Sequence, residues 1–362
     1  MPDKSDYKEH VVYLLGAGFS APLGIPVISD FLFRAKDLYF REPEKYKHFI
    51  EILHVIGDMH KAKTYFEVDL LNIEEILSIL EMKSLVTGQD MRSKFEQFIR
   101  DVIVATTPQI PCPSVQVLAR GQFQGLPGNF HDVLFGGEIW RLYSHFIGAL
   151  LRLRLILSEP RPEQYPIQQV LMDQISGIGV DYNVITLNYD EVIEAVWRHL
   201  DTYCLDAPNP GAIPKFQLAK LHGTVSGRLT PPTWHKLADS ESVHQWSIAH
   251  ELLGAATAIS ILGYSLPIAD SYIRYLLESA VIDAPNLKRI DVICLDSPDG
   301  ALRKKYTQFI TFKPFRFANA DIRDYLSARG LVVSSVPGQR PIHHDFLGLE
   351  SVHEEFMRTH SG

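Results

Sequence analysis

The sequence predicts an α/β protein with a Rossmann-like parallel sheet and a large helical insertion. Short apolar runs that end in glycine or polar residues alternate with segments of helical period, which is the pattern of a doubly wound sheet. The run VVYLL at 11–15 enters the turn Gly16-Ala17-Gly18, and a continuous apolar strand of this kind is typical of a parallel sheet buried on both faces. Helical period dominates in a long stretch between two alternating regions.

The N-terminal region predicts a strand and then two helices. Residues 19–39 have helical character that is interrupted at Gly24-Ile25-Pro26, and we expect Ser29 to cap the second helix. In the stretch that follows, Asn72 is a candidate N-cap before apolar residues at helical spacing, and 138–157 predicts a long helix. The proline- and glycine-rich residues 106–129 predict a long loop between them.

The alternation of strands and helices returns at residue 183. Strands are predicted at 184–187, 216–221, 258–262 and 290–295, with 311–315 as a candidate final strand, and helices at 189–200, 269–280 and 320–329. The predicted organisation is therefore a discontinuous α/β domain of residues 1–40 and 175–330, a helical insertion of residues 41–174, and a C-terminal tail of residues 331–362.

Composition excludes several classes of protein. The chain has 362 residues, 46% of them hydrophobic and 22% charged, which is ordinary for a folded protein. Its net charge of −8 argues against non-specific nucleic-acid binding. Cys112, Cys204 and Cys294 lie far apart, so this chain alone cannot build a four-thiolate zinc site. With a polar N-terminus and no apolar run near the roughly 20 residues of a membrane helix, we expect a soluble cytoplasmic protein.

Four predicted strand ends carry polar or glycine motifs. These are Gly16-Ala17-Gly18, Asn188-Tyr189-Asp190, His222-Gly223 and Gly263-Tyr264-Ser265. In an open α/β sheet, ligands bind at the carboxyl ends of the strands. We therefore expect the four motifs to converge on one site.

Each motif alone also has a structural interpretation. The glycine turn favours an anion site, but its GxGx5G spacing does not meet the dinucleotide fingerprint, and it can be a simple tight turn. Asn188 or Asp190 can cap the next helix, and His222 can be a structural histidine rather than a base working near neutral pH. The Gly263 motif can likewise be only a turn.

Together, the motifs GAGxS…GIP, TxNxD, HG and GxS resemble those of the sirtuin superfamily, the silent-information-regulator-type NAD-binding proteins. The resemblance covers residues 8–36 and 180–300. The forms TLNYD and GYSLPIADSYIRYLL, and PPTWHK at 231–236, look more like prokaryotic sirtuin-like NAD hydrolases of antiphage defence than like protein deacetylases. The zinc cysteines of deacetylases are absent, and Val27-Ile28-Ser29 follows GIP where deacetylases read DFR.

The resemblance implies an NAD hydrolase that uses NAD as substrate and needs no zinc, and that releases nicotinamide and ADP-ribose. It assigns Asn188 to the ribose and to orienting a water, Asp190 to the carboxamide, and His222 to the role of base. Around the diphosphate it places Gly16, Ala17, Gly18 and Ser20, with Pro26, Thr186 and Gly263 as further pocket residues and Ser265 at a phosphate or the adenosine. Asp296, after a predicted strand, is a candidate ligand of the adenosine ribose.

An ungated NAD hydrolase would harm its host, so we expect control by homo-oligomer assembly or by a partner. The resemblance suggests a HerA-type ATPase, an Argonaute or a phage protein as that partner, and depletion of NAD in abortive infection as the outcome. Two other functions remain open at this point. One is a module that senses NAD or ADP-ribose without turnover, and the other is a protein deacylase or ADP-ribosyltransferase.

Overall fold

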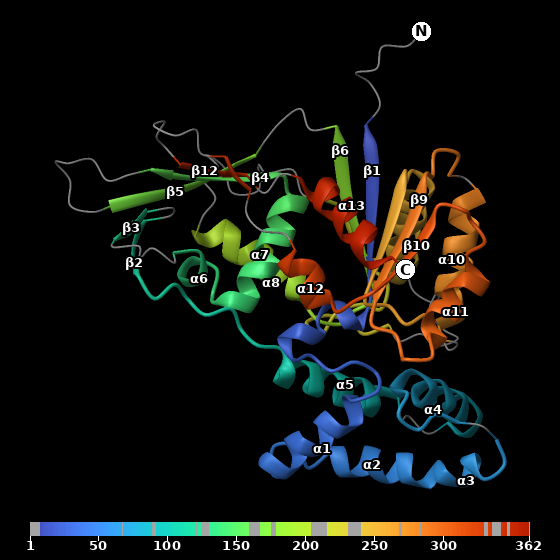
Figure 1. Ribbon diagram of the computed structural model, residues 1–362. Coiled ribbons are helices and arrows are strands. Elements are labelled where there is room, and N and C mark those ends of the chain that lie inside the picture. The colour runs from blue at the N-terminus through green and yellow to red at the C-terminus, as the bar shows by residue number, and fades with distance from the viewer. Residues whose placement is uncertain are drawn as a thin grey trace.

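The structure, a computed structural model, is built on a six-stranded parallel sheet (Figure 1). It describes residues 8–66, 68–88, 92–119, 122–124, 130–158, 167–174, 179–203, 216–230, 240–267, 270–282, 284–328, 332–334, 342–345 and 348–361. The strands of the parallel sheet are β1 (Glu9–Leu15), β6 (Val180–Thr186), β7 (Leu218–Lys220), β8 (Ala258–Leu262), β9 (Arg289–Cys294) and β10 (Phe315–Asn319).

The strand order is β7-β6-β1-β8-β9-β10, the 3-2-1-4-5-6 order of a doubly wound fold. The order reverses between β1 and β8, so the topological switch point lies between the ends of these two strands. Val11 to Leu15 of β1 have no exposed surface, and all of β8 is buried. The parallel strands and their order confirm the predicted α/β, Rossmann-like class. The buried strands also agree with it, because a parallel sheet of this kind is covered on both faces.

Helices cover both faces of this sheet and bury alternate residues of β1. Val11, Tyr13 and Leu15 pack in one core with α7 (Glu138–Leu150), α8 (Val192–Tyr203), α12 (Ile322–Ser327) and α13 (Leu349–His360). Val12 and Leu14 pack in the other with α9 (Ser240–Gly254), α10 (Ser271–Ile282) and α11 (Ala301–Phe309). The alternation follows from the period of two along a strand.

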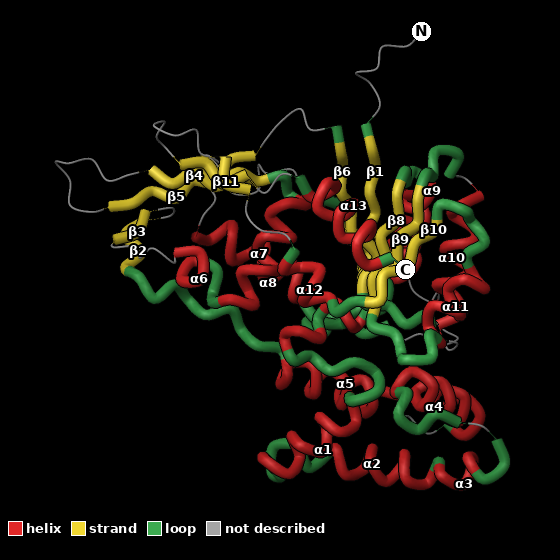
Figure 2. Tube along the Cα trace, viewed as in Figure 1, coloured by secondary structure: helices red, strands yellow, loops and turns green. Residues whose placement is uncertain are grey.

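A separate helical layer lies beyond the carboxyl ends of the strands, as Figure 2 shows. It contains α1 (Phe31–Arg41), α2 (Phe49–Asp58), α3 (His60–Lys63), α4 (Ile73–Thr87) and α5 (Arg92–Thr106), and it has its own apolar core. The Asn72 side chain accepts hydrogen bonds from the backbone N–H groups of Glu74 and Glu75 at 3.0 and 3.3 Å, which confirms the predicted cap of α4.

A second, antiparallel sheet was not predicted. Its order is β11-β12-β4-β5-β3-β2, with β2 (Gln116–Ala119), β3 (Gln122–Gln124), β4 (Leu153–Ser158), β5 (Ile167–Gln174), β11 (Val332–Ser334) and β12 (Ile342–Asp345). Residues 41–174 are therefore not helical throughout. The tail, 331–362, pairs with this stretch through β12 and β4, so the division into three units stays a prediction.

Several predicted boundaries are wrong. The helix expected over 138–157 ends at Leu150, because Arg152 takes a φ of +56° and the chain turns into β4. The loop expected at 106–129 contains the hairpin β2–β3. The final strand begins at Phe315 rather than 311, after Pro314. Helices α9, α11 and α13 were not predicted.

The segment after the glycine turn also differs from the prediction. Two short 3-10 turns, η2 (Ala17–Phe19) and η3 (Ala21–Leu23), stand where a helix was expected. Helix α1 begins at Phe31 with Asp30 in the capping position, so Ser29 is not its cap. No helix among the described residues combines the length and apolar character that crossing a membrane requires.

Candidate functional site

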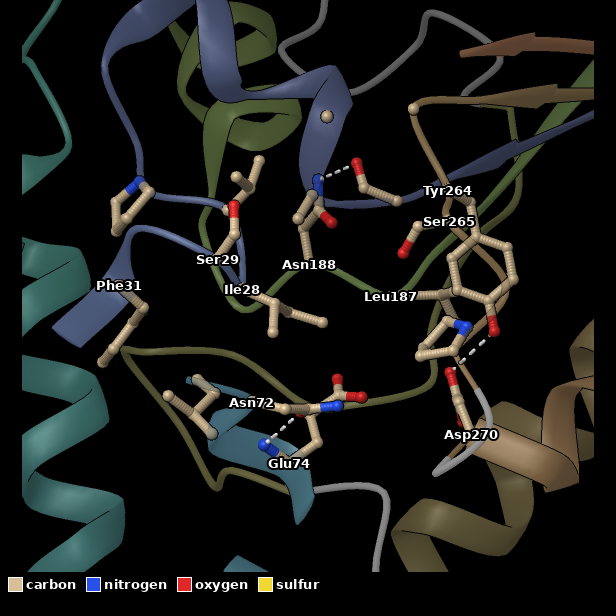
Figure 3. A pocket seen from close by; sticks show the side chains of 18 of the residues that line it. Ile28, Ser29, Phe31, Asn72, Glu74, Leu187, Asn188, Tyr264, Ser265 and Asp270 are labelled. Atoms are coloured by element: carbon tan, nitrogen blue, oxygen red, sulfur yellow. Dashed lines mark hydrogen bonds between the residues drawn. The ribbon is translucent and has the colours of Figure 1, made fainter. Parts of the chain in front are cut away.

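A cavity of about 1340 Å³ lies between the carboxyl ends of the parallel strands and the helical layer (Figure 3). Small-molecule sites commonly enclose roughly 300–1,000 Å³, so this cavity has room for a ligand as large as a dinucleotide. The predicted site residues that line it are Gly16, Ala17, Gly18, Pro26, Asn188, Asp190, His222, Gly263 and Ser265. The structure thus brings all four sequence motifs to one place. Of the other predicted residues, Ser20, Thr186 and Asp296 are not among those that line it.

The glycine turn is shaped by close contact between two loops. A Cβ atom on Gly16 would lie 2.6 Å from Tyr264 Cα, and one on Gly18 would lie 2.8 Å from Gly263 Cα. Backbone N–H groups of Gly16 and Gly18 donate to the carbonyls of Leu262 and Gly263 at 2.9 and 2.8 Å. These glycines therefore allow the ends of β1 and β8 to meet.

The turn offers less to an anion than the sequence suggested. The N–H groups of Phe19 and Ser20 donate to the carbonyls of Gly16 and Ala17, at 2.9 and 3.1 Å. Within 16–20, the N–H of Ala17 is the donor with no carbonyl acceptor among the described residues. Since no α-helix starts here, the expected helix dipole is missing as well. An anion at this turn would be held by Ala17 rather than by a cradle of several amides.

Asn188 belongs to a buried polar network behind the turn. Its Nδ2 donates to the carbonyl of Gly16 at 3.0 Å and to Ser20 Oγ at 3.2 Å. Its backbone N–H donates to Thr186 Oγ1 at 3.1 Å, so Ser20 and Thr186 position Asn188 from behind the cavity wall. Figure 3 shows the amide oxygen of Asn188 directed toward the hollow. Asn188 thus offers an acceptor to a ligand in a fixed orientation.

Asp190 has both a structural and an electrostatic role. Its Oδ1 accepts from the N–H of Val192 at 3.1 Å, which is the capping interaction that the sequence left open. Burial raises the pKa of Asp190, while the charge of Lys220 and a hydrogen bond from Ser20 act in the opposite direction. Lys220 Nζ donates to the backbone carbonyl of Asp190 at 2.6 Å. Asp190 is therefore a lining carboxyl in a restrained geometry.

His222 follows β7 and is 2% exposed. Its Nε2 lies 3.7 Å from Oδ2 of Asp270, which is 1% exposed. The ring lies beside that of Tyr189, with centroids 5.8 Å apart. Tyr264 donates its hydroxyl to the same Oδ2 of Asp270 at 3.0 Å. A titratable ring with a buried carboxylate behind it suits acid–base chemistry.

Beside Ser265, the cavity contains a cation that the sequence analysis did not identify. Lys305, on α11, lines the cavity and donates to the backbone carbonyl of Ser265 at 3.2 Å. Burial and the positive charge of Arg274 lower its pKa. No motif marks this residue, because α11 was not predicted. Asp296 is not among the lining residues, and its carboxylate accepts from the N–H groups of Leu302 and Arg303 at 2.8 and 3.0 Å. Its role as a ribose ligand stays a prediction.

The wall of the cavity that the helical layer forms is acidic. Glu74 lies in the first turn of α4, is 8% exposed, and points its carboxylate into the hollow (Figure 3). Asp69 and Glu75 line the same wall. The sequence predicted the helix and its Asn72 cap. It did not predict that these carboxylates line the cavity, because the docking of α4 on the sheet is a tertiary feature.

No known family model matches this chain, and no curated protein matches it. Solved structures do. A structure of Sir2Tm bound to a propionylated peptide is 13% identical, covers 89% of this chain and 92% of that one, and has a TM-score of 0.35. A structure of Sir2 with a p53 peptide and NAD+ is 13% identical over the same shares, with a TM-score of 0.34.

Metal ligands do not cluster in the described part of the chain: no three His, Cys, Asp or Glu side chains gather in a way that would hold an ion. Cys112 is exposed and Cys294 is buried, and burial raises the pKa of the Cys294 thiol to about 12. Cys204 and residues 231–236 lie outside the described residues. The expectation that the protein works without zinc stays a prediction.

Proposed function

We propose that this protein cleaves the bond between nicotinamide and ribose in NAD, releasing nicotinamide and ADP-ribose. The observation that carries the proposal is the meeting of Asn188, Asp190 and His222 in one cavity at the switch point of the sheet. These are the three residues to which the sirtuin-like motifs assign the ribose, the carboxamide and the base. A pocket that only binds a nucleotide needs no buried histidine with a carboxylate behind it.

The polarity of the cavity supports this substrate. Lys305 lies at one side, beside Ser265, and Glu74 with its acidic neighbours lies on the α4 wall. NAD carries a negatively charged diphosphate and a positively charged nicotinamide ring. Opposite charges attract strongly in a site shielded from water. The diphosphate would face Lys305 and Ala17, and the cationic ring would face the acidic wall.

The residues supply three kinds of help to the reaction. Glycosidic cleavage gives the ribose oxocarbenium character, which neighbouring oxygen acceptors and carboxylates stabilise. The Asn188 amide oxygen orients a ribose hydroxyl or the attacking water. His222 takes the proton that the water loses, and such base catalysis contributes about 10²- to 10⁴-fold.

We also propose that the activity is gated, because free NAD hydrolysis would be toxic to the cell that makes the enzyme. The resemblance of the motifs favours a role in antiphage defence, in which NAD is depleted once infection is sensed. Assembly into a homo-oligomer, or contact with a HerA-type ATPase, an Argonaute or a phage protein, would supply the trigger. The helical layer and the second sheet are the surfaces open to such control.

The test is nicotinamide release from NAD over a series of protein concentrations. We expect turnover by the wild type and loss of at least about 10²-fold in Asn188→Ala and in His222→Ala. Asp37→Asn, an exposed change on α1, is the matched control and keeps full activity. A steep dependence on protein concentration would support gating by assembly.

Other outcomes would redirect the assignment. Binding of ADP-ribose without turnover at any concentration, with or without a partner, would indicate a sensor module. A mass shift on an acylated or ADP-ribosylated peptide would indicate a deacylase or a transferase. Full activity in Asn188→Ala and His222→Ala would show that the cavity is not the site of the reaction.

A further inference from the structure

Asp270 is the buried charged group closest to His222 in the described structure. Its Oδ2 lies 3.7 Å from His222 Nε2, and both side chains are at most 2% exposed. Nε2 has no hydrogen-bond partner among the described residues. A buried polar atom without a partner is costly, so a small movement that brings Nε2 onto the carboxylate would be favourable. Catalytic hydrogen bonds are often long until a ligand binds.

The carboxylate of Asp270 is itself held in place. Tyr264 donates its hydroxyl to Oδ2 at 3.0 Å, and the backbone carbonyl of Tyr264 accepts from the hydroxyl of Tyr306 at 2.8 Å. Asp270 directly precedes α10, whose N-terminal dipole favours a negative charge at that position. The group is therefore restrained by contacts on the loop after β8 and lies behind His222, which follows β7.

We propose that Asp270 is a positioning residue that orients His222 and stabilises the imidazolium formed during the reaction, and that Tyr264 holds Asp270 in place. The inference rests on the proposed function and adds to it. Because Nε2 faces Asp270, only Nδ1 of His222 is left for the substrate. Asp270 thus fixes the tautomer with the proton on Nε2 and leaves Nδ1 as the base, as a carboxylate does in a catalytic triad.

The step balances without any further reactant. The water oxygen bonds to C1′ of the ribose as the bond from C1′ to nicotinamide breaks. The electron pair of that bond stays on the ring nitrogen, which becomes neutral. His222 Nδ1 accepts a proton from the water, and the resulting imidazolium is stabilised by the negative charge of Asp270. The proton on Nε2 stays with the histidine throughout.

Other titratable groups also face His222. Tyr189 contributes a ring from the loop after β6, and Glu74 and Asp190 line the same cavity. In the described part of the chain, none of these groups forms an ion pair with His222, whereas Asp270 Oδ2 lies 3.7 Å from its Nε2. The carboxylates of the cavity can affect the charge of His222 in a general way, but only Asp270 is placed to select its tautomer.

The experiment compares the full chain with Asp270→Asn, Tyr264→Phe and Asp37→Asn. The first readout is the ring ¹⁵N spectrum of His222, identified by its loss in His222→Asn. We expect one tautomer, protonated on Nε2, in the wild type and in Asp37→Asn. In Asp270→Asn we expect a mixture or the other tautomer. The same tautomer in folded Asp270→Asn as in the wild type would overturn the proposal.

The second readout is nicotinamide release. In Asp270→Asn we expect kcat to fall by about 10²- to 10⁴-fold, with KM within a few-fold of the wild type. If Asp270→Asn does not fold, Tyr264→Phe carries the test, and an unchanged kcat in that variant would overturn the proposal.

The two readouts separate this inference from the proposed function. A changed tautomer in a protein that never releases nicotinamide would support the Asp270–His222 pair and count against the reaction. Normal kcat in Asp270→Asn, together with loss of activity in His222→Ala, would support the reaction and remove Asp270 from it.

Discussion

Gly263 shows how a single residue shapes the site. It has a φ of +63°, and a Cβ at this position would overlap the backbone of Gly18 and Phe19. Only glycine fits here, because every other residue is strained at this φ and carries a Cβ that would overlap the neighbouring backbone. The motif was visible in the sequence. Its reason, contact between the ends of β1 and β8, was not, because the two loops lie almost 250 residues apart in the chain.

We predict that Gly263→Ala destabilises the protein by about 3 kcal/mol or more. The new side chain is strained at this positive φ, and the backbone of Gly18 and Phe19 must also move to make room for it. Gly24→Ala is the matched control. Gly24 also has a positive φ, of +88°, but a Cβ there meets nothing within 4 Å. Its cost should be about 1 kcal/mol. Chemical denaturation measures both, and equal losses would contradict the packing argument.

Asp190 should lower stability at neutral pH. Burial raises its pKa, so the folded state holds its proton more tightly than the unfolded state does. Stability from this group is fully present below its unfolded pKa and is lost as the pH rises through its folded pKa. We predict that Asp190→Asn raises the Tm at pH 7, where each kcal/mol corresponds to about 1–2 °C in a chain of 362 residues, while activity falls.

Thermal melts across pH test this prediction. The gain in Asp190→Asn over the wild type should shrink as the pH falls below the folded pKa of Asp190. A gain that is independent of pH would mean that packing, rather than ionisation, is responsible.

At the scale of elements, an ion cluster centred on the buried carboxylate of Asp291 holds α13 against the parallel sheet. Arg316 on β10 makes two bonds of 2.7 Å to the carboxylate of Asp291 on β9, which has no exposed surface. Arg316 also binds Glu354 of α13 at 2.7 Å, and His353 Nε2 lies 2.9 Å from Asp291 Oδ2. No pattern in the sequence indicated this arrangement, because the partners come from three elements and share no motif.

We predict that Arg316→Ala costs about 3–5 kcal/mol, because it removes the bidentate partner of a buried carboxylate. The control is Arg358→Ala on α13, whose ion pair with Glu355 is exposed on both sides and should contribute about 0–1 kcal/mol. Urea unfolding of the two variants gives the comparison. Similar losses would show that the cluster adds nothing beyond a surface pair.

The cluster should also make the fold sensitive to acid. Burial acts to raise the pKa of Asp291, but the hydrogen bonds from Arg316 and His353 outweigh it and hold the pKa below its usual range. Stability from Asp291 is therefore present above its unfolded pKa and is lost as the pH falls through its folded pKa.

At the scale of the whole molecule, the C-terminal residues complete two parts of the fold. Strand β12 pairs with β4 in the second sheet, and α13 packs along β10 of the first. The sequence suggested a separate tail. Its strand partners lie some 190 residues earlier, and pairing over such distances leaves no local pattern to read.

We predict that deleting residues 329–362 destabilises the parallel sheet rather than trimming an appendage. The deletion exposes Ala318 and Tyr325, which share a core with α13, and leaves Asp291 without His353. The shortened chain should melt well below the full chain and be cut by proteases within the 41–328 region. A truncated protein with an unchanged Tm would restore the view of this segment as a tail.

Local sequence patterns were enough to predict the parallel sheet, its buried strands and the four motifs at the strand ends. Apolar runs and glycine turns are local signals, and the carboxyl ends of parallel strands must share one edge. Tertiary structure decided the rest of the site. Lys305, Glu74 and the pairing of His222 with Asp270 come from elements that meet only after folding. The contact between the glycine turn after β1 and the loop after β8 is also a tertiary feature, because contacts between distant segments depend on how whole elements pack.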